Sequence, residues 1–261
     1  MRPALRTKFG LDTGRRFDPE LMRRLWRYGV PNGLQLFVEI AAVSVFILLM
    51  GSLGTEAMAA TTLAFNVNSM AFVPVIGLGI AVSTIVGQQL GQNRADLAAR
   101  ATWTTFVIAM GYTGVMALLY VSIPDVFLMG HASGAAAGEF DRLRDMVVVF
   151  LRFVAAYCLF DAAAIVFVSA IKGAGDTRFI LFTTICTAPL PVLVGWLGIV
   201  TFGWGIVWCW IVITAWICLM GVIYLVRFLG GRWRSMRVIE PDFLTRSVVE
   251  TPLDELVLEE A

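Results

Sequence analysis

Two acidic residues lie deep inside apolar stretches of the sequence. Glu39 is the only charged residue of the stretch 33–46, and Asp161 is the only acid of the stretch 146–171. A carboxylate at the centre of a bilayer costs about 2.5–3.5 kcal/mol, so such side chains usually face a helix-bundle interior or a water-filled cavity. Both residues are therefore candidates for a functional site, although each acid could instead only hydrogen-bond a neighbouring helix.

Buried carboxyl groups are suited to the exchange of cations. A low dielectric disfavours the ionised form, so the group can hold a proton at neutral pH, and an arriving cation favours ionisation and release of that proton. Two such groups could exchange a proton or a sodium ion for an organic cation. Intramembrane acid–base catalysis is a remote alternative, because it needs both acids within shared-proton distance and a route for water. No catalytic residue is assigned, and no metal site beyond possible sodium binding at Glu39 and Asp161.

Polar residues near the acids would line such a site. Residues three or four apart share a helix face. Asn32 and Gln35 therefore lie on the Glu39 face, and Tyr157 lies on the Asp161 face. A further polar stripe with Asn66 and Ser69 lies in the apolar segment that follows Glu39. The predicted cavity lining is Gln35, Asn66, Tyr157, Asn32 and Ser69.

The elements that must hold these residues are membrane helices. The 261-residue chain is 59% hydrophobic with a mean hydropathy of +0.81, which exceeds the values of ordinary soluble domains. Six apolar segments are each long enough to cross a bilayer as a helix, and they lie near residues 30–51, 57–87, 99–122, 146–171, 179–202 and 205–228. The sequence predicts an all-α membrane protein. Prolines in PVIGLG (74–79) and APLP (188–191) predict bends in the second and fifth segments.

The basic residues predict the orientation of these spans. Of the 20 lysines and arginines, all but Arg142, Arg144 and Arg152 fall on one side. The positive-inside rule then places both termini in the cytoplasm, in a multi-pass protein of the inner or plasma membrane. At 1.5 Å per residue, Glu39 lies about 12 Å and Asp161 about 15 Å from the cytoplasmic surface. An aromatic belt is expected at the outer ends of the last two spans, with a cation–π surface as the alternative, from Trp196, Trp204, Trp208 and Trp210.

Three regions are expected along the chain. Residues 1–29 form a cytoplasmic arm and interlobe linker whose segment 18–29 is a short interfacial helix. Residues 30–228 form the six-span bundle. Residues 229–261 form an acidic cytoplasmic tail that is largely disordered.

Several motifs, in order along the chain, resemble the multidrug and toxic compound extrusion (MATE) family. YGVPNGLQLFVE (28–39) is similar to the start of that family's seventh helix, and GTEAMAA (54–60) with NSMAFVPVIGLGIAVSTIVGQQLG (68–91) is similar to its eighth. YCLFDAAAIVFVSAIKGAGDTRF (157–179) is similar to its tenth helix and the following turn.

The resemblance implies the C-terminal half of a twelve-helix, cation-coupled exporter of organic cations. Glu39 and Asp161 match the family's acidic cation-binding positions, but Val43 stands where some members have a second carboxylate. The implied partners are organic cations, the lipid bilayer, and an N-terminal lobe or a second copy of the chain, with no nucleic acid and no cofactor beyond the coupling proton or sodium ion. The alternative is a non-transporting membrane subunit or an inert half-transporter.

Overall fold

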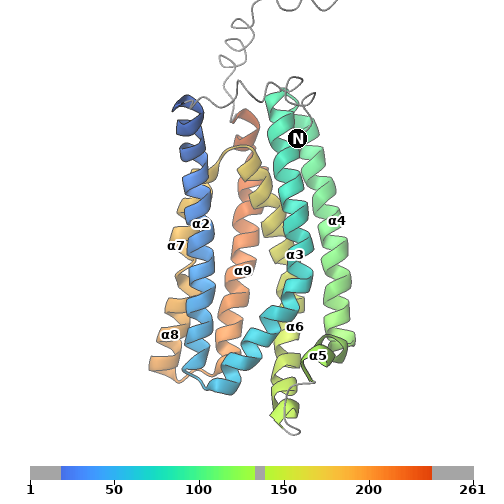
Figure 1. Cartoon of the computed structure of the whole chain (residues 1–261), viewed down its shortest axis with the longest axis vertical. Coiled ribbons are helices and arrows are strands. Elements are labelled where there is room, and N and C mark those ends of the chain that lie inside the picture. The colour runs from blue at the N-terminus through green and yellow to red at the C-terminus, as the bar shows by residue number, and fades with distance from the viewer. Residues whose placement is uncertain (1–18, 133–138, 237–261) are drawn as a thin grey trace, which may run out of the picture.

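The computed structural model describes residues 19–132 and 139–236 and shows an all-helical bundle (Figure 1). Six helical segments are long and apolar enough to cross a membrane, as the sequence predicts. The elements in chain order are α2 (Pro19–Gly51), α3 (Thr55–Gly91), α4 (Ala95–Ser122), α5 (Pro124–Ala132), α6 (Glu139–Gly173), α7 (Thr177–Thr187), α8 (Leu190–Phe202), α9 (Ile206–Leu229) and the 3-10 turn η1 (Arg232–Ser235). Both ends of the described chain lie at the same end of the bundle, which the positive-inside rule assigns to the cytoplasm.

Helix α6 is the central element, packed mainly against α3, α9 and α4, and it is the most buried of the candidate spans. Small residues allow its close approach to two neighbours. A Cβ on Gly79 of α3 would lie 2.6 Å from the Ser169 hydroxyl of α6, and one on Gly221 of α9 would lie 2.8 Å from the Phe160 carbonyl oxygen. Membrane helices pack through such small residues because lipid supplies no hydrophobic driving force between them. Asp161, directly after Phe160, is thereby held at a tight α6–α9 contact.

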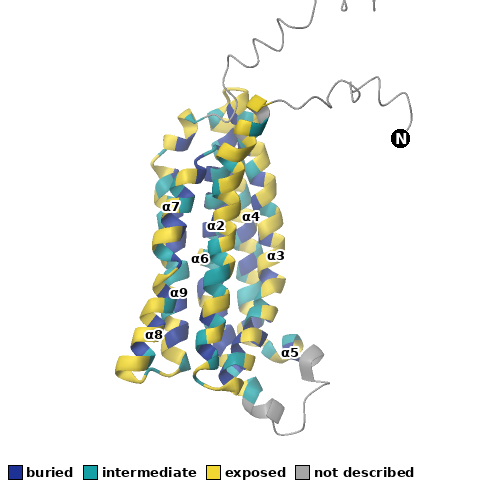
Figure 2. Cartoon of the chain, turned by 60° about the vertical axis from the view of Figure 1, so that its left-hand side comes forward, coloured by how far each residue is buried: buried dark blue, intermediate teal, exposed yellow. Residues whose placement is uncertain are grey.

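Helix α2 lies on the other side of the bundle, against α7, α3 and α8. Figure 2 shows that the burial is uneven, with exposed residues over the outer faces of the helices and buried residues towards their mutual contacts. Helix α2 makes few close backbone approaches to α6 and α9, so the two acid-bearing helices are not a packed pair.

Prolines break the regular hydrogen bonding of two spans. Pro74 has no N–H, so the Met70 carbonyl lacks its usual helical donor, and the Tyr112 hydroxyl of α4 donates to that carbonyl at 2.7 Å. The fifth span is interrupted between α7 and α8 at Ala188 and Pro189. The helix is interrupted where a bend is expected, at residues 188–191, and Pro74 lies inside α3, whose Thr55 end is inclined to the rest of the helix in Figure 1.

The segments flanking the bundle differ from expectation. Residues 19–29 are the first turns of α2 and not a separate short helix, because the helix runs unbroken through Pro31. The first residues of the predicted tail, 229–261, form an ordered turn. Gly231, with φ 70°, precedes η1, and the Trp233 indole N–H donates to the Phe228 carbonyl at 2.8 Å. The rest of the tail, 237–261, and the arm up to residue 18 lie outside the described residues.

Candidate functional site

Glu39 lies in the middle of α2 and is surrounded by polar groups from three helices. The Gln35 side-chain N–H donates to the Glu39 carboxylate from one turn earlier. The Thr184 hydroxyl of α7 approaches the same carboxylate, and the Tyr224 hydroxyl of α9 lies near Thr184. Neither hydroxyl completes a hydrogen bond of good geometry. Glu39 therefore has one firm partner and two neutral oxygens close by.

Asp161 approaches this group from α6. It is half-buried and interacts electrostatically with Glu39. Tyr157, one turn earlier on the same helix, is 1% exposed, and its hydroxyl has no hydrogen-bond partner. Tyr157 also interacts electrostatically with Asp161. The structure thus places the two predicted acids on α2 and α6 close enough to influence each other.

A lysine of α6 lies near Glu39. Lys172 lies in the last turn of α6 and interacts electrostatically with Glu39. It follows Asp161 by eleven residues, which is about three helical turns, so the two residues share one face of α6. Lys172 therefore supplies a cation belonging to the protein itself beside the proposed cation site.

Several of the buried polar side-chain atoms that lack a hydrogen-bond partner lie in this part of the molecule. Side-chain atoms that are buried without a hydrogen-bond partner include Gln35 Oε1, Thr184 Oγ1 and Tyr224 Oη, and all three residues are at most 4% exposed. Buried polar groups are normally satisfied by protein, water or an ion. Oxygens from three helices beside one carboxylate form a set that can hold water or a hard monovalent cation.

The other predicted lining residues lie farther out. Asn32, on the Glu39 face of α2, is exposed near the start of the apolar span. On α3, Asn66 and Ser69 are exposed, and the Ser69 hydroxyl donates to the Asn66 backbone carbonyl in the same helix. The described residues show no interaction between these three side chains and either acid, so their contribution to the lining stays a prediction.

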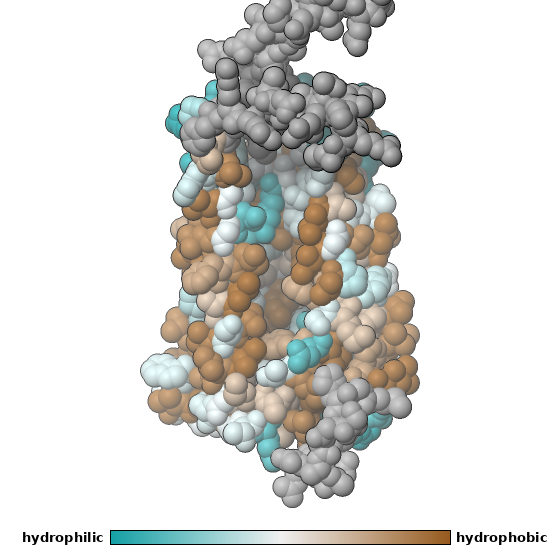
Figure 3. All heavy atoms as spheres, viewed as in Figure 1, coloured by the Kyte–Doolittle hydropathy of each residue, from teal (hydrophilic) through white to brown (hydrophobic). Residues whose placement is uncertain are grey.

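A hollow opens on the face of the bundle between α2 and α3. Figure 3 shows the space-filling surface recessed along this line, with hydrophilic residues inside its upper part, towards the end that contains Pro19, and hydrophobic residues along its rims. Glu39 is on α2, which borders this hollow, and Asp161 is on the central helix α6.

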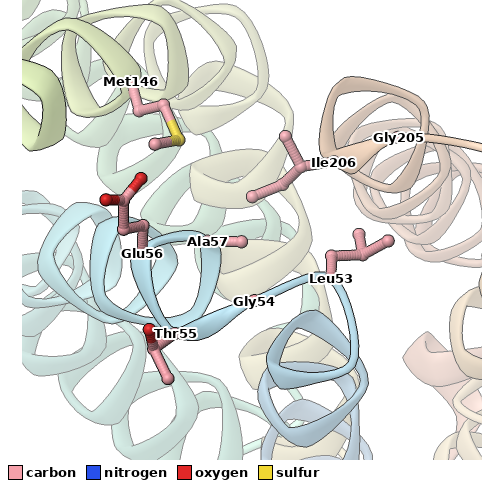
Figure 4. A pocket seen from close by; sticks show the side chains of 8 residues that line it. All are labelled: Leu53, Gly54, Thr55, Glu56, Ala57, Met146, Gly205 and Ile206. Atoms are coloured by element: carbon pink, nitrogen blue, oxygen red, sulfur yellow. The ribbon is translucent and has the colours of Figure 1, made fainter.

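Two smaller pockets lie at the ends of the bundle. One of about 440 Å³ lies where α2 meets α3 (Figure 4), and is lined by Glu56, Met146 and Ile206 among others. The other, of about 260 Å³, lies at the opposite end and is lined by Arg27, Asp176 and Arg178 among others. Neither includes Glu39 or Asp161, so neither is the predicted site.

Sequence reasoning missed three residues near Glu39. Lys172 lies just beyond the predicted fourth segment, 146–171, and neither Thr184 nor Tyr224 stands out in the sequence. A usable signal was depth: Thr184 lies seven residues inside α7 and Tyr224 five residues from the end of α9, which is about 10 and 8 Å from the cytoplasmic ends at 1.5 Å per residue. Both are thus near the depth of Glu39.

The fold and the site together define a polytopic membrane protein with a charged cleft inside one helical lobe, as in secondary transporters. The MatE family model matches residues 31–197, and the chain belongs to this family of multidrug efflux transporters, which is a transporter and not an enzyme family. The protein is accordingly a multi-pass membrane protein, and its bacterial homologues lie in the inner membrane.

Individual relatives give the extent of the match. A probable multidrug resistance protein NorM from Brucella suis biovar 1 is 27% identical over 230 residues, 82% of this chain and 46% of the relative. Multidrug resistance protein MdtK from Yersinia enterocolitica is 31% identical over 64% of this chain and 35% of its own length. A crystal structure of a MATE protein in the bent conformation superposes with a TM-score of 0.70 at 16% identity, over 85% of this chain and 47% of that one. The chain spans about half the length of the relatives it matches, which is one six-helix lobe.

Proposed function

We propose that this chain is the C-terminal lobe of a multidrug exporter, in which Glu39 and Asp161 exchange a coupling ion for an organic cation. The observations that carry the proposal are that these two acids from different helices interact electrostatically, and that buried polar atoms near Glu39 have no hydrogen-bond partner. A structural role for each acid alone predicts firm hydrogen bonds to neighbouring helices, and Asp161 has none among the described residues.

The exchange follows from the charges of the site. A coupling proton or sodium ion neutralises the carboxylates, and an arriving organic cation displaces it because both occupants compete for the same negative charge. For sodium, Glu39 would be assisted by oxygens of Gln35, Thr184 and Tyr224. Val43 adds no second carboxylate on α2. Lys172 keeps Glu39 partly balanced while the site is empty, so its charge sets how strongly a mobile cation is held.

Transport also needs an opposing wall. Alternating access in transporters built from repeats rocks one bundle against another around a fixed site, and this chain supplies six spans. We assign the opposing wall to an N-terminal lobe or to a second copy of the chain, placed over the hollow between α2 and α3. This places both acids at the centre of the assembly.

The proposal is tested in proteoliposomes that contain the chain, alone or together with the N-terminal half of the Brucella suis relative. Efflux of a fluorescent organic cation is driven by an imposed proton or sodium gradient. We expect gradient-dependent efflux that Asp161→Asn abolishes and Glu39→Gln reduces at least tenfold. Asp145→Asn is the matched control, since Asp145 has an 81% exposed side chain at the far end of the same helix.

Full gradient-dependent efflux by Asp161→Asn would remove the acids from the mechanism. Absence of efflux in every assembly, with cation binding intact, would favour the alternative of a non-transporting membrane subunit.

A further inference from the structure

The pocket at the cytoplasmic end of the bundle is strongly basic. Its lining combines the start of α2, the turn between α6 and α7, and the end of the described chain. Arg27 and Arg178 line it, are exposed, and have no carboxylate partner among the described residues. Two arginines from separate helices therefore direct unbalanced positive charge to one cavity of about 260 Å³.

The single acid of the pocket is neutralised by a third arginine. Arg227 of α9 donates two hydrogen bonds to Asp176 Oδ2, at 2.9 and 2.6 Å. The Arg227 guanidinium is also held over the Phe179 ring, 4.3 Å from its centroid. Because Asp176 is occupied in this way, its side chain makes no capping hydrogen bond to the first turn of α7. The net charge left to the cavity is that of Arg27 and Arg178.

The position of the pocket fits the level of lipid headgroups. The first apolar span begins at Leu25, and α6 and α7 meet at residues 173–177, so the cavity lies where these helices leave the hydrocarbon region. Trp26, next to Arg27, is 63% exposed, and Tyr28 lines the cavity. Tryptophan and tyrosine concentrate at this interface in membrane proteins.

We propose that this pocket binds the phosphate group of an anionic phospholipid from the cytoplasmic leaflet. Arginine matches phosphate oxygens with paired N–H donors, and basic pockets between membrane helices on the cytoplasmic side bind such headgroups. The bound lipid would join the start of α2, which carries Glu39, to the α6–α7 turn below Lys172. The inference does not depend on transport.

Native mass spectrometry of the full chain in detergent, titrated with phosphatidylglycerol, tests the proposal. We expect Arg27→Gln/Arg178→Gln to weaken retention of this lipid about 25-fold, or about fivefold for each arginine. The matched control is Arg94→Gln/Arg100→Gln, which removes two exposed arginines from the same end of the bundle but outside the pocket. The control should stay within about threefold of the unmodified chain. Arg27→Lys/Arg178→Lys should retain more lipid than the glutamine variant, because lysine keeps the charge, but less than the unmodified chain, because lysine lacks the paired N–H donors.

Three results would overturn the proposal. Equal retention by the pocket variant and its control would show that the arginines do not bind lipid. Equally tight retention of zwitterionic phosphatidylcholine, or displacement of the lipid by millimolar inorganic phosphate, would exclude an anionic lipid as the specific occupant. In the Arg27→Lys variant, residue 27 could form cross-links to Glu240 or Asp242 and none to a photoreactive phosphatidylglycerol. That result would assign the pocket to the chain's own acidic segment.

Discussion

The Trp210 indole in the outer half of the bundle and the polar groups beside Glu39 differ in how far they are satisfied within the chain. Around Trp210 the helices form a closed aromatic core: its ring stacks on Phe150 at 4.6 Å and on Phe65 at 5.4 Å between centroids. Its indole N–H donates to the Thr61 hydroxyl at 3.4 Å. Around Glu39, by contrast, hydroxyl and amide oxygens of Gln35, Thr184 and Tyr224 are buried without partners.

The contrast separates what holds the lobe together from what the lobe can bind. Large rings packed at van der Waals distance stabilise a fold through many small contacts. Unpartnered buried oxygens beside a carboxylate lower stability unless something else satisfies them. The outer half therefore has the features of a scaffold, and the acid region has those of a site that is completed by water, an ion or a ligand. Substitutions in the two regions should then differ in kind.

The largest effect on stability is expected at Trp210, which is fully buried. Trp210→Ala leaves a cavity among Phe65, Phe150 and Phe153 and should lower the free energy of unfolding by about 3–5 kcal/mol. The measurement is the thermal unfolding temperature of the purified chain in detergent. Trp196→Ala is the control, since Trp196 is 53% exposed, and it should change that temperature by a few degrees at most. Equal losses in the two variants would contradict the division into scaffold and site.

Replacing the two acids by their amides should raise the unfolding temperature or leave it unchanged. Glu39→Gln and Asp161→Asn keep the shape of the side chain and remove a carboxyl group that, when ionised, costs about 2.5–3.5 kcal/mol to bury in a bilayer. We expect the unfolding temperature in lipid nanodiscs to stay constant or to rise. A fall as large as that of Trp210→Ala would mean that the acids hold helices together and are not reserved for a mobile cation.

The smallest effect on the unfolding temperature is expected at the exposed ion pair between α5 and α6. The Arg144 guanidinium donates to both Asp125 oxygens, at 2.6 and 2.8 Å, and holds the pKa of Asp125 below its ordinary value. The folded pKa is lowered, so any stabilisation is present at neutral pH and is lost as the pH falls through that folded pKa. Such exposed pairs contribute little. Asp125→Asn should lower the unfolding temperature by about a degree at pH 7, and this difference should shrink as the pH falls. A difference that grew towards acid pH would contradict this sign.

The sequence predicts the spans well because membrane helices are specified locally. Length and apolarity alone locate the segments, and the break at Ala188–Pro189 follows from proline chemistry. The two acids stand out for the same reason, since a carboxylate in an apolar run needs an explanation. The resemblance to the MATE family matched Glu39 and Asp161 to cation-binding positions, which the pattern of apolar and acidic residues alone does not do.

Contacts between helices that are far apart in the sequence could not be predicted in the same way. Trp210, expected in an interfacial belt with its neighbours, is instead enclosed by rings from α3 and α6. Lys172, which follows an apolar run as an ordinary end-of-helix lysine does, interacts with Glu39 of a helix more than 120 residues earlier in the chain. The burial of Trp210 and the interaction of Lys172 with Glu39 both depend on which helix faces contact each other. Those contacts are determined by several segments of the sequence together.

Carbodiimide labelling of the purified, unmodified chain is the most direct test of the claim that Glu39 and Asp161 share one cation site. Apolar dicyclohexylcarbodiimide reacts with protonated carboxyl groups inside membranes, and mass spectrometry of peptides gives the extent of modification at each acid. We predict that Glu39 and Asp161 are both labelled and that tetraphenylphosphonium protects the two together, while labelling of exposed Glu56 is unaffected. Labelling of Glu39 and Asp161 that no organic cation, sodium ion or rise in pH reduces would contradict the account.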